Sequence, residues 1–414
     1  MTFSAPDPRP TAPDRPTAAD LPALGDIEPA LLEDWFRTRY FDARTDISSS
    51  GAQNYTLGRL RAVLGIESGE LDALMFRDSP SLGCDPLREA VAARYAPGRT
   101  ERVMITHGST EAIFLALSAI VRPGDEVVVL RPVYQSLSSV AAALGATLRV
   151  WELRPEDGFV PDVSRLRELT GPRTRAVVVN FPHNPTGTMP DEDGYRELLS
   201  HVDSLGCYLL WDAAFADLAY DRDPLPDPSA VLDRCVSFGT LSKSYGLPGL
   251  RIGWCLAPPE VLTAMVRLRD YVSISTSPLN ELIATRVLQR ADRVLRPLRE
   301  QAVRNRALLT AWAAEHPGLV DLPVPRGGVS AFPLFPGVPD MTPVCERLLA
   351  EDGVLVVPGA CFGHPGRLRI GFGGPTDELR DGLDAVVRAV EKTLAESPDR
   401  GTATGGAVPG TPMT

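Results

Sequence analysis

The chain has 414 residues, of which 44% are apolar and 23% charged, which is enough for a packed core and favours two domains. Its net charge of −11 argues against nucleic acid as the main partner, and no apolar run approaches the ~20 residues of a membrane-spanning helix. The six cysteines form no CxxC pair and the five histidines no HxxxH pair, so we expect neither a disulfide framework nor a metal site. These features favour a cytoplasmic protein with neither a membrane nor a nucleic-acid partner.

The two ends of the chain differ in composition from its middle. Residues 1–25 and 395–414 are rich in Pro, Thr, Gly or Asp, and we expect disordered tails there. Residues 26–50 should form a helix, at 30–40, and a crossover segment that packs on a smaller domain. We expect a large domain over residues 51–290 and a smaller α/β domain over residues 291–394.

Short apolar runs alternate with helical patterns through the first half of the chain, helices being expected at 110–121 and 191–205. Continuous apolar strands of this kind predict an α/β fold with a mostly parallel, seven-stranded sheet covered on both faces. A further helical region, 279–315, should bend or break at Pro297. The predicted strands are 103–106, 126–130, 147–153, 176–180, 207–211, 235–238 and 252–257.

Polar residues follow several of these strands at their carboxyl ends, where α/β sheets bind ligands. They include an anion-binding helix start, an aromatic ring, an amide, a carboxylate, hydroxyls, an amine and a second cation, which together suit pyridoxal 5′-phosphate (PLP). In chain order they are Gly108, Ser109, Thr110, Tyr134, Asn184, Asp212, Thr240, Ser242, Lys243 and Arg251.

Lysine is rare in this chain. Of 42 basic residues only Lys243 and Lys392 are lysines, and Lys243 lies in a Gly- and Ser-rich turn where no helix-surface role is obvious. Unlike arginine, lysine can lose its proton near neutral pH and bond covalently to an aldehyde. Lys243 is therefore the predicted reactive amine.

The ordered set Asn184-Pro-Thr-Gly, Asp212 and Ser242-Lys243-x5-Gly-x-Arg251-x-Gly resembles the class I/II aminotransferases, fold type I of the PLP enzymes. The resemblance implies a PLP-binding large domain, a homodimer, and an amino acid as substrate. It implies that Lys243 binds PLP covalently, Asp212 pairs with the pyridine nitrogen, Asn184 contacts the phenolic oxygen and Tyr134 stacks on the ring. The remaining strand-end residues, Gly108, Ser109, Thr110, Thr240, Ser242 and Arg251, would complete the cofactor site.

A second matching segment lies near the carboxyl end of the chain. Val-Pro-Gly-x2-Phe-Gly at 357–363, followed by Arg367-Leu-Arg369-Ile, resembles the family's substrate-carboxylate segment. The resemblance assigns Arg369 to the α-carboxylate of the substrate. Arg367 is expected to be a solvated residue at the end of a strand.

Two positions depart from the family pattern. Phe215 stands where many members have a tyrosine that donates to the phenolic oxygen, so Phe215 should lie at the cofactor without that hydroxyl. Asp78 stands where many have a tyrosine that reaches the partner subunit's phosphate. With both changes the cofactor site should be retained, but its contacts to the phenolic oxygen and to the phosphate should differ from those of other members.

The segment 32–55, with Glu33-Asp-Trp-Phe and Ser-Ser-Ser-Gly51, resembles capreomycidine synthases. These enzymes remove the β-hydroxyl of a hydroxylated arginine and close a cyclic guanidino amino acid for antibiotic biosynthesis. The resemblance implies substrate contacts by Gly51, Asn184 and Arg369.

Alternative functions are an amino acid:2-oxo acid aminotransferase and, with less support, a PLP-sensing regulator. Acids that would hold a guanidinium are not identified by any motif. Asp78, Asp217 and Glu281 are candidates on charge alone.

Overall fold

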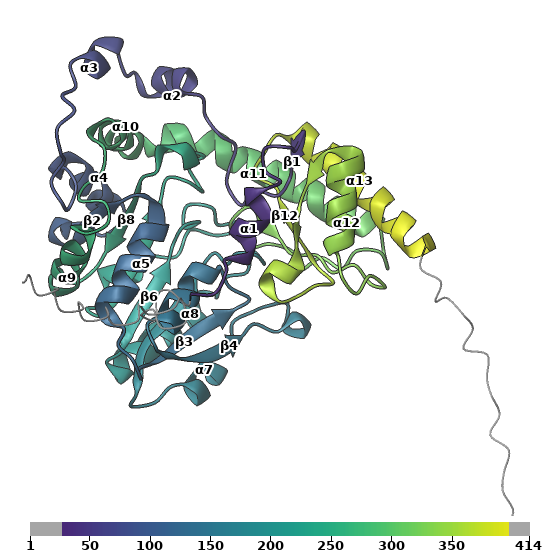
Figure 1. Cartoon of the computed structure of the whole chain (residues 1–414), viewed down its shortest axis with the longest axis horizontal. Helices are drawn as coiled ribbons and strands as arrows, with labels where there is room; N and C mark the ends of the chain where they lie inside the picture. Colours follow the sequence, from purple (N-terminus) through teal and green to yellow (C-terminus); the bar gives the residue numbers. More distant parts are fainter. Residues whose placement is uncertain (1–26, 397–414) are drawn as a thin grey trace, which may run out of the picture.

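The computed structural model describes residues 27–396 of the chain (Figure 1). The predicted tail at 1–25 lies outside the described residues, and so does most of the second predicted tail. Helix α13 (Thr376–Glu396) includes the first two residues of that predicted tail. Within residues 27–396, no helix combines the length and the apolar character needed to cross a membrane.

The largest element is a seven-stranded sheet in which β8 runs opposite to the other six strands. The prediction of a mostly parallel seven-stranded sheet is confirmed, with strand ends shifted by one or two residues. In sheet order the strands are β2 (Val103–Thr106), β8 (Gly253–Leu256), β7 (Cys235–Thr240), β6 (Tyr208–Asp212), β5 (Thr174–Asn180), β3 (Glu126–Arg131) and β4 (Thr147–Glu152).

Helices cover both faces of this sheet because its central strands are apolar on both sides. In β3, Val127 and Val129 are buried in one apolar cluster and Val128 and Leu130 in another. The first cluster includes residues of α5 (Gly108–Ile120), α6 (Ser139–Ala143) and α9 (Pro259–Arg269), and the second includes residues of α7 (Val163–Leu169) and α8 (Glu192–Leu205).

Further helices pack at the β2 and β8 side of the sheet. They are α2 (Leu57–Leu64), α4 (Asp85–Tyr95), α10 (Pro278–Gln289) and α11 (Ala291–Glu315), and the short α3 (Ser68–Asp72) follows α2.

The helical region was expected to bend or break at Pro297, and the structure shows no break there. The helical region divides at Arg290, whose backbone leaves helical geometry (φ −126°, ψ 32°), and Pro297 lies inside α11. Leu295 and Leu298, on either side of Pro297, are buried. Their packing stabilises the helical conformation at Pro297, although proline disfavours the interior of a helix.

The C-terminal part has its own small antiparallel sheet, β11 (Val357–Pro358), β12 (Leu368–Gly371) and β9 (Ser330–Ala331), with α12 (Thr342–Arg347) and α13. Figure 1 shows this part beside the large sheet, with α11 running between the two. The domain boundaries themselves stay a prediction.

The N-terminal segment packs on this C-terminal part. Strand β1 (Thr45–Asp46) pairs with β10 (Val354–Leu355), and in α1 (Leu31–Arg37) the indole of Trp35 donates to the carbonyl of Val356 at 2.9 Å. Helix α1 is thereby fixed beside the sheet edge at which the predicted site residues gather.

Candidate active site

The register of the large sheet brings the predicted site residues to one edge. Asn180 and Asp212, the last residues of β5 and β6, are directly paired across the strands. Thr240, the last residue of β7, is paired with Gly253 at the start of the antiparallel β8. The carboxyl ends of neighbouring strands therefore form one side of a common cavity.

This cavity has a volume of about 550 Å³, within the range that small-molecule sites occupy. All predicted site residues line it except Gly51 and Gly108, each of which is next in the chain to a lining residue, Ser50 and Ser109. The predicted residues that line it are Ser109, Thr110, Tyr134, Asn184, Asp212, Phe215, Thr240, Ser242, Lys243, Arg251 and Arg369.

Lys243 presents its amine to this cavity. Its Nζ donates to the Ser50 hydroxyl at 3.0 Å. Desolvation in the site, followed by the positive charge of Arg369, lowers the pKa of Lys243 to about 8. A substantial fraction of such an amine is neutral near physiological pH, as a nucleophile or proton acceptor requires.

Asp212 is a buried carboxylate with one free oxygen. Its Oδ1 accepts from the amide of Ala214 at 3.1 Å, while among residues 27–396 no hydrogen bond reaches Oδ2. Burial raises the pKa of Asp212 to about 6 despite the hydrogen bond and the nearby Lys243. A buried carboxylate of this kind is suited to accept a proton-bearing, cationic ring nitrogen.

Asn184 and Arg369 are held next to each other. The main-chain amide of Asn184 donates to Oδ1 of Asn180 at 2.8 Å. The side-chain NH2 of Asn180 in turn donates to the main-chain carbonyl of Asp212 at 3.0 Å. Arg369 donates from its terminal nitrogens to Asn184 Oδ1 at 3.4 Å and to the Ser48 carbonyl at 2.8 Å.

The guanidinium of Arg369 remains incompletely paired. Its Nε is buried with no hydrogen-bond partner among the described residues, and burial lowers the pKa of Arg369 to about 10. An incompletely paired buried guanidinium is a strong binding element for a carboxylate.

An anion cradle forms where α5 begins. Gly108 has φ +76°, a backbone conformation that favours glycine, and a Cβ at this position would lie 2.6 Å from a terminal nitrogen of Arg251, which would then have to shift. Arg251 donates to the His107 carbonyl at 3.3 Å, and the Thr240 and Ser242 hydroxyls are 3.0 Å apart. Amides of a helix start, hydroxyls and a guanidinium are together the donor set of a phosphate site.

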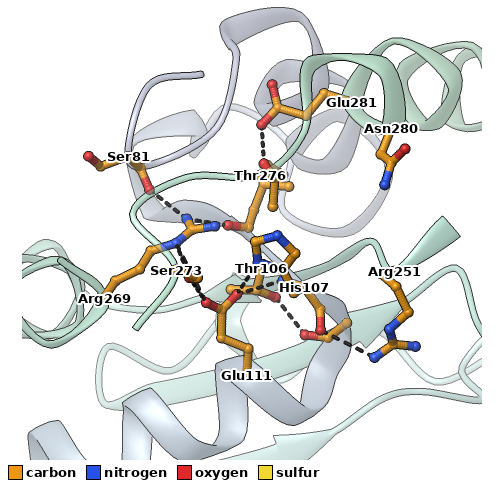
Figure 2. Close-up of polar contacts among 12 residues, drawn as sticks. Ser81, Thr106, His107, Glu111, Arg251, Arg269, Ser273, Thr276, Asn280 and Glu281 are labelled. Atoms are coloured by element: carbon orange, nitrogen blue, oxygen red, sulfur yellow. Dashed lines mark hydrogen bonds and ion pairs between the residues drawn. The ribbon is translucent and has the colours of Figure 1, made fainter. Parts of the chain in front are cut away.

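A buried polar cluster lies beneath this cradle (Figure 2). Glu111 of α5 accepts from the main-chain amide of His107 at 2.6 Å and from the Ser273 hydroxyl, and lies 3.7 Å from Arg269 Nε. Arg269, which is fully buried, also donates to the Ser81 and Ile105 carbonyls at 2.6 and 2.7 Å. Burial alone would raise the pKa of Glu111, but hydrogen bonds from the His107 ring, the Ser273 hydroxyl and the His107 amide, together with the Arg269 charge, lower it to about 2. The cluster therefore ties the cradle to the loop that follows α9.

A family model for class I and II aminotransferases matches residues 76–386. The chain belongs to this family. Its members are PLP-dependent enzymes, and the chain is one of them.

Individual relatives differ in how similar they are to this chain. A capreomycidine synthase from Streptomyces vinaceus is 55% identical over 364 residues, covering 87% of this chain and 93% of that protein. An aspartate/prephenate aminotransferase from Thermus thermophilus is 30% identical over 319 residues, covering 75% and 83%. The solved structure of the PLP-dependent cyclase OrfR is 42% identical with a TM-score of 0.84, covering 88% of this chain and 98% of that one.

The residues present fit PLP. The cradle around Arg251 suits its phosphate, the free Oδ2 of Asp212 suits its ring nitrogen, and the amine of Lys243 suits its aldehyde. The side-chain NH2 of Asn184 donates to no described residue and faces the same cavity, so it is available to the phenolic oxygen.

The acids suggested by charge alone lie elsewhere. Asp217 is ion-paired with Arg94, and Glu281 accepts from the Ser79 hydroxyl at 2.8 Å and the Cys84 amide at 3.2 Å. Asp78 is exposed and does not line the cavity. None of the three residues suggested as guanidinium ligands lines the cavity of the described chain.

Two further findings were not predicted. Arg367 is buried rather than solvated, because its guanidinium lies 4.8 Å from the centre of the Phe159 ring and donates to the Phe332 carbonyl. The N-terminal segment also lines the cavity, and the only signal for this was its resemblance to capreomycidine synthases. The residues concerned are Leu32, Glu33, Phe36, Tyr40, Ser49, Ser50 and Asn54.

Proposed function

We propose that this chain is a PLP-dependent cyclase that removes the β-hydroxyl of a hydroxylated arginine and closes a cyclic guanidino amino acid, as in antibiotic biosynthesis. The observation that carries the proposal is its similarity to a capreomycidine synthase, which is much higher than its similarity to the aspartate/prephenate aminotransferase. The N-terminal segment that lines the cavity is part of the same resemblance.

Residues of the cavity account for binding of substrate and cofactor and for transfer of the Cα proton. Arg369 binds the α-carboxylate, and Asp212, Asn184, Tyr134 and the cradle hold the cofactor. When bound, PLP supplies an electron sink for negative charge at the substrate Cα. Lys243, with its pKa of about 8, takes the Cα proton and returns it at the end of the reaction.

The proposed conversion balances without a second reactant. The β-hydroxyl leaves with one proton as water, and a guanidine nitrogen then bonds to Cβ and releases a proton. The product is the substrate minus one water, with no change in oxidation state overall. An aminotransferase instead needs a 2-oxo acid to receive the amino group.

The need for an acceptor separates the two functions. The purified holoenzyme is incubated with 3-hydroxyarginine in the presence and absence of a 2-oxo acid, and products are identified by mass spectrometry. We expect a cyclic product of the substrate mass minus water at the same rate in both. Turnover that requires the 2-oxo acid, with the amino group transferred to it, would establish the aminotransferase and overturn the proposal.

A homodimer is the assembly that the exposed apolar residues favour. Met75 and Phe76, which follow α3, are 73% and 77% exposed, and Tyr271 in the loop after α9 is 93% exposed. Such residues are typical of a surface that another subunit covers. Light scattering of the holoenzyme should give twice the chain mass, and an active monomer would contradict this assembly.

The free thiols favour a cytoplasmic location. All six cysteines lie in the described part of the chain and none is in a disulfide. Unpaired cysteines are typical of proteins in reducing compartments. Fractionation of the producing cells should therefore recover the protein with the cytoplasmic contents, whereas recovery outside the cell would contradict it.

A further inference from the structure

Helix α1 presents an acidic and aromatic face to the active-site cavity. Leu32, Glu33 and Phe36, at helical spacing, and Tyr40 just beyond the helix all line it. Trp35 on the other side of the helix is 7% exposed and hydrogen-bonded to Val356, which fixes the orientation of the helix.

Glu33 is one of two carboxylates among the residues that line this cavity, the other being Asp212. It accepts a hydrogen bond from the Tyr134 hydroxyl at 3.1 Å. No ion pair of Glu33 occurs within residues 27–396, so its charge is not neutralised by a neighbouring arginine. Its negative charge raises the pKa values of Lys243 and Arg369 against the lowering effect of burial, which places both groups within its field.

The aromatic rings beside Glu33 suit a flat cation. Phe36 and Tyr40 pack edge to face with ring centres 6.1 Å apart, and the Arg369 guanidinium already lies 5.7 Å from the centre of the Phe36 ring. A carboxylate next to aromatic faces is an arrangement that binds guanidinium groups, through paired hydrogen bonds and cation–π contact.

We propose that Glu33 binds the guanidinium of the substrate and thereby determines the specificity for arginine-derived amino acids. This inference rests on the proposed function, because it assigns the side-chain end of that substrate. Tyr134 orients the Glu33 carboxylate, and Arg369 receives the other end of the molecule. Asp217 and Glu281 are already paired elsewhere in the chain, with Arg94 and with Ser79, and Glu33 is the acid that lines this chain's cavity beside the aromatic rings.

The test compares two ligands of nearly equal shape. L-arginine and L-citrulline both lack the β-hydroxyl, and only arginine carries a positive charge at the end of its side chain. Their dissociation constants are measured from the absorbance change of the holoenzyme. We expect wild type to prefer arginine. In Glu33→Gln, arginine binding should weaken about 10-fold, whereas citrulline binding should change less than about 3-fold. The expected loss of arginine affinity is small for a charge-assisted contact because Glu33 is exposed. Effects of the substitution on Lys243 act on both ligands and cancel in the comparison.

Two further variants keep this test decisive. Asp34→Asn changes the neighbouring acid on the same helix, which pairs with Arg37 and does not line the cavity, and it should leave the preference unchanged. Glu33→Asp keeps the charge with a shorter reach and should retain part of the preference. Equal weakening of both ligands in Glu33→Gln, or an unchanged preference, would overturn the inference. The product analysis of wild type tests the proposed function separately, since arginine binding requires no cyclisation.

Discussion

Replacing Asp212 by asparagine should stabilise the cofactor-free protein while impairing the holoenzyme. The ordinary pKa of this carboxyl is 3.8, and burial raises it to about 6 in the folded chain. One pKa unit corresponds to about 1.36 kcal/mol, so the charged form of Asp212 costs the folded cofactor-free protein up to about 3 kcal/mol. Asparagine keeps the oxygen that accepts from Ala214 and removes the charge.

The sign of the pH dependence follows from a raised pKa on an acid. Below pH 3.8 the carboxyl is protonated in both the folded and the unfolded chain, and the cost is absent. Between pH 3.8 and about 6 the folded chain retains the proton that the unfolded chain has lost, so the cost grows with pH. Above about pH 6 the full cost remains. The advantage of Asp212→Asn over wild type should therefore rise through this window and then stay constant.

Urea unfolding of both cofactor-free proteins at matched concentrations and several pH values measures this difference. We expect Asp212→Asn to be more stable by about 1–3 kcal/mol at pH 7.5, and the difference should fall to about 0.5 kcal/mol near pH 4. The holoenzyme of the variant should retain PLP and lose activity by ~100-fold or more, as when a preorganised electrostatic group is removed. A variant that is less stable at pH 7.5, or a pH-independent difference, would refute the reasoning.

Three other substitutions or treatments test separate parts of the site. Borohydride reduction of the holoenzyme should attach the cofactor to Lys243, as read by peptide mass mapping, and a label on Lys392 would remove Lys243 from its assigned role. Phe215→Tyr places a hydroxyl in the cavity, and this hydroxyl should stabilise the anionic phenolic oxygen of the cofactor. The absorbance of the holoenzyme should therefore titrate at lower pH. An unchanged titration would mean that Phe215 does not face that oxygen. Glu111→Gln removes a carboxylate that accepts from His107 and Ser273, and should destabilise the protein by about 1–3 kcal/mol and weaken PLP binding. Hydrogen bonds and the Arg269 charge outweigh the raising effect of burial and hold the pKa of Glu111 at about 2, below its ordinary 4.5. Its contribution should therefore be complete above about pH 4.5 and be lost as pH falls from there through about 2. Wild-type PLP affinity and stability in Glu111→Gln would contradict this role.

The residues that could be predicted from the sequence are those placed by the sheet. Asn184, Asp212 and Lys243 follow apolar strands, and parallel strands bring their carboxyl ends together whatever the details of packing. The resemblance to a known family then supplied a role for each of them.

The residues that were missed depend on contacts between distant segments. The packing of the N-terminal helix on the C-terminal part was expected, but which of its side chains faces the cavity depends on how α1 is rotated there, and the sequence did not single out Glu33 for that position. Pro297 and Arg367 were misjudged for the same reason, since burial among tertiary neighbours overrode the local preference of each.

The charges that line the cavity complement a particular set of ligand charges. Lys243, Arg251 and Arg369 are cationic, and Asp212 and Glu33 are anionic. A phosphate and an α-carboxylate match the two arginines, and a protonated ring nitrogen matches Asp212, which leaves Glu33 with no partner from the cofactor or the amino acid main chain. A substrate with a carboxylate side chain would bring like charge towards Glu33 in a partly desolvated site, whereas a guanidinium brings the opposite charge. If Glu33 has the role proposed for it, the carboxylate on α1 suits this cavity to a cationic amino acid better than to aspartate.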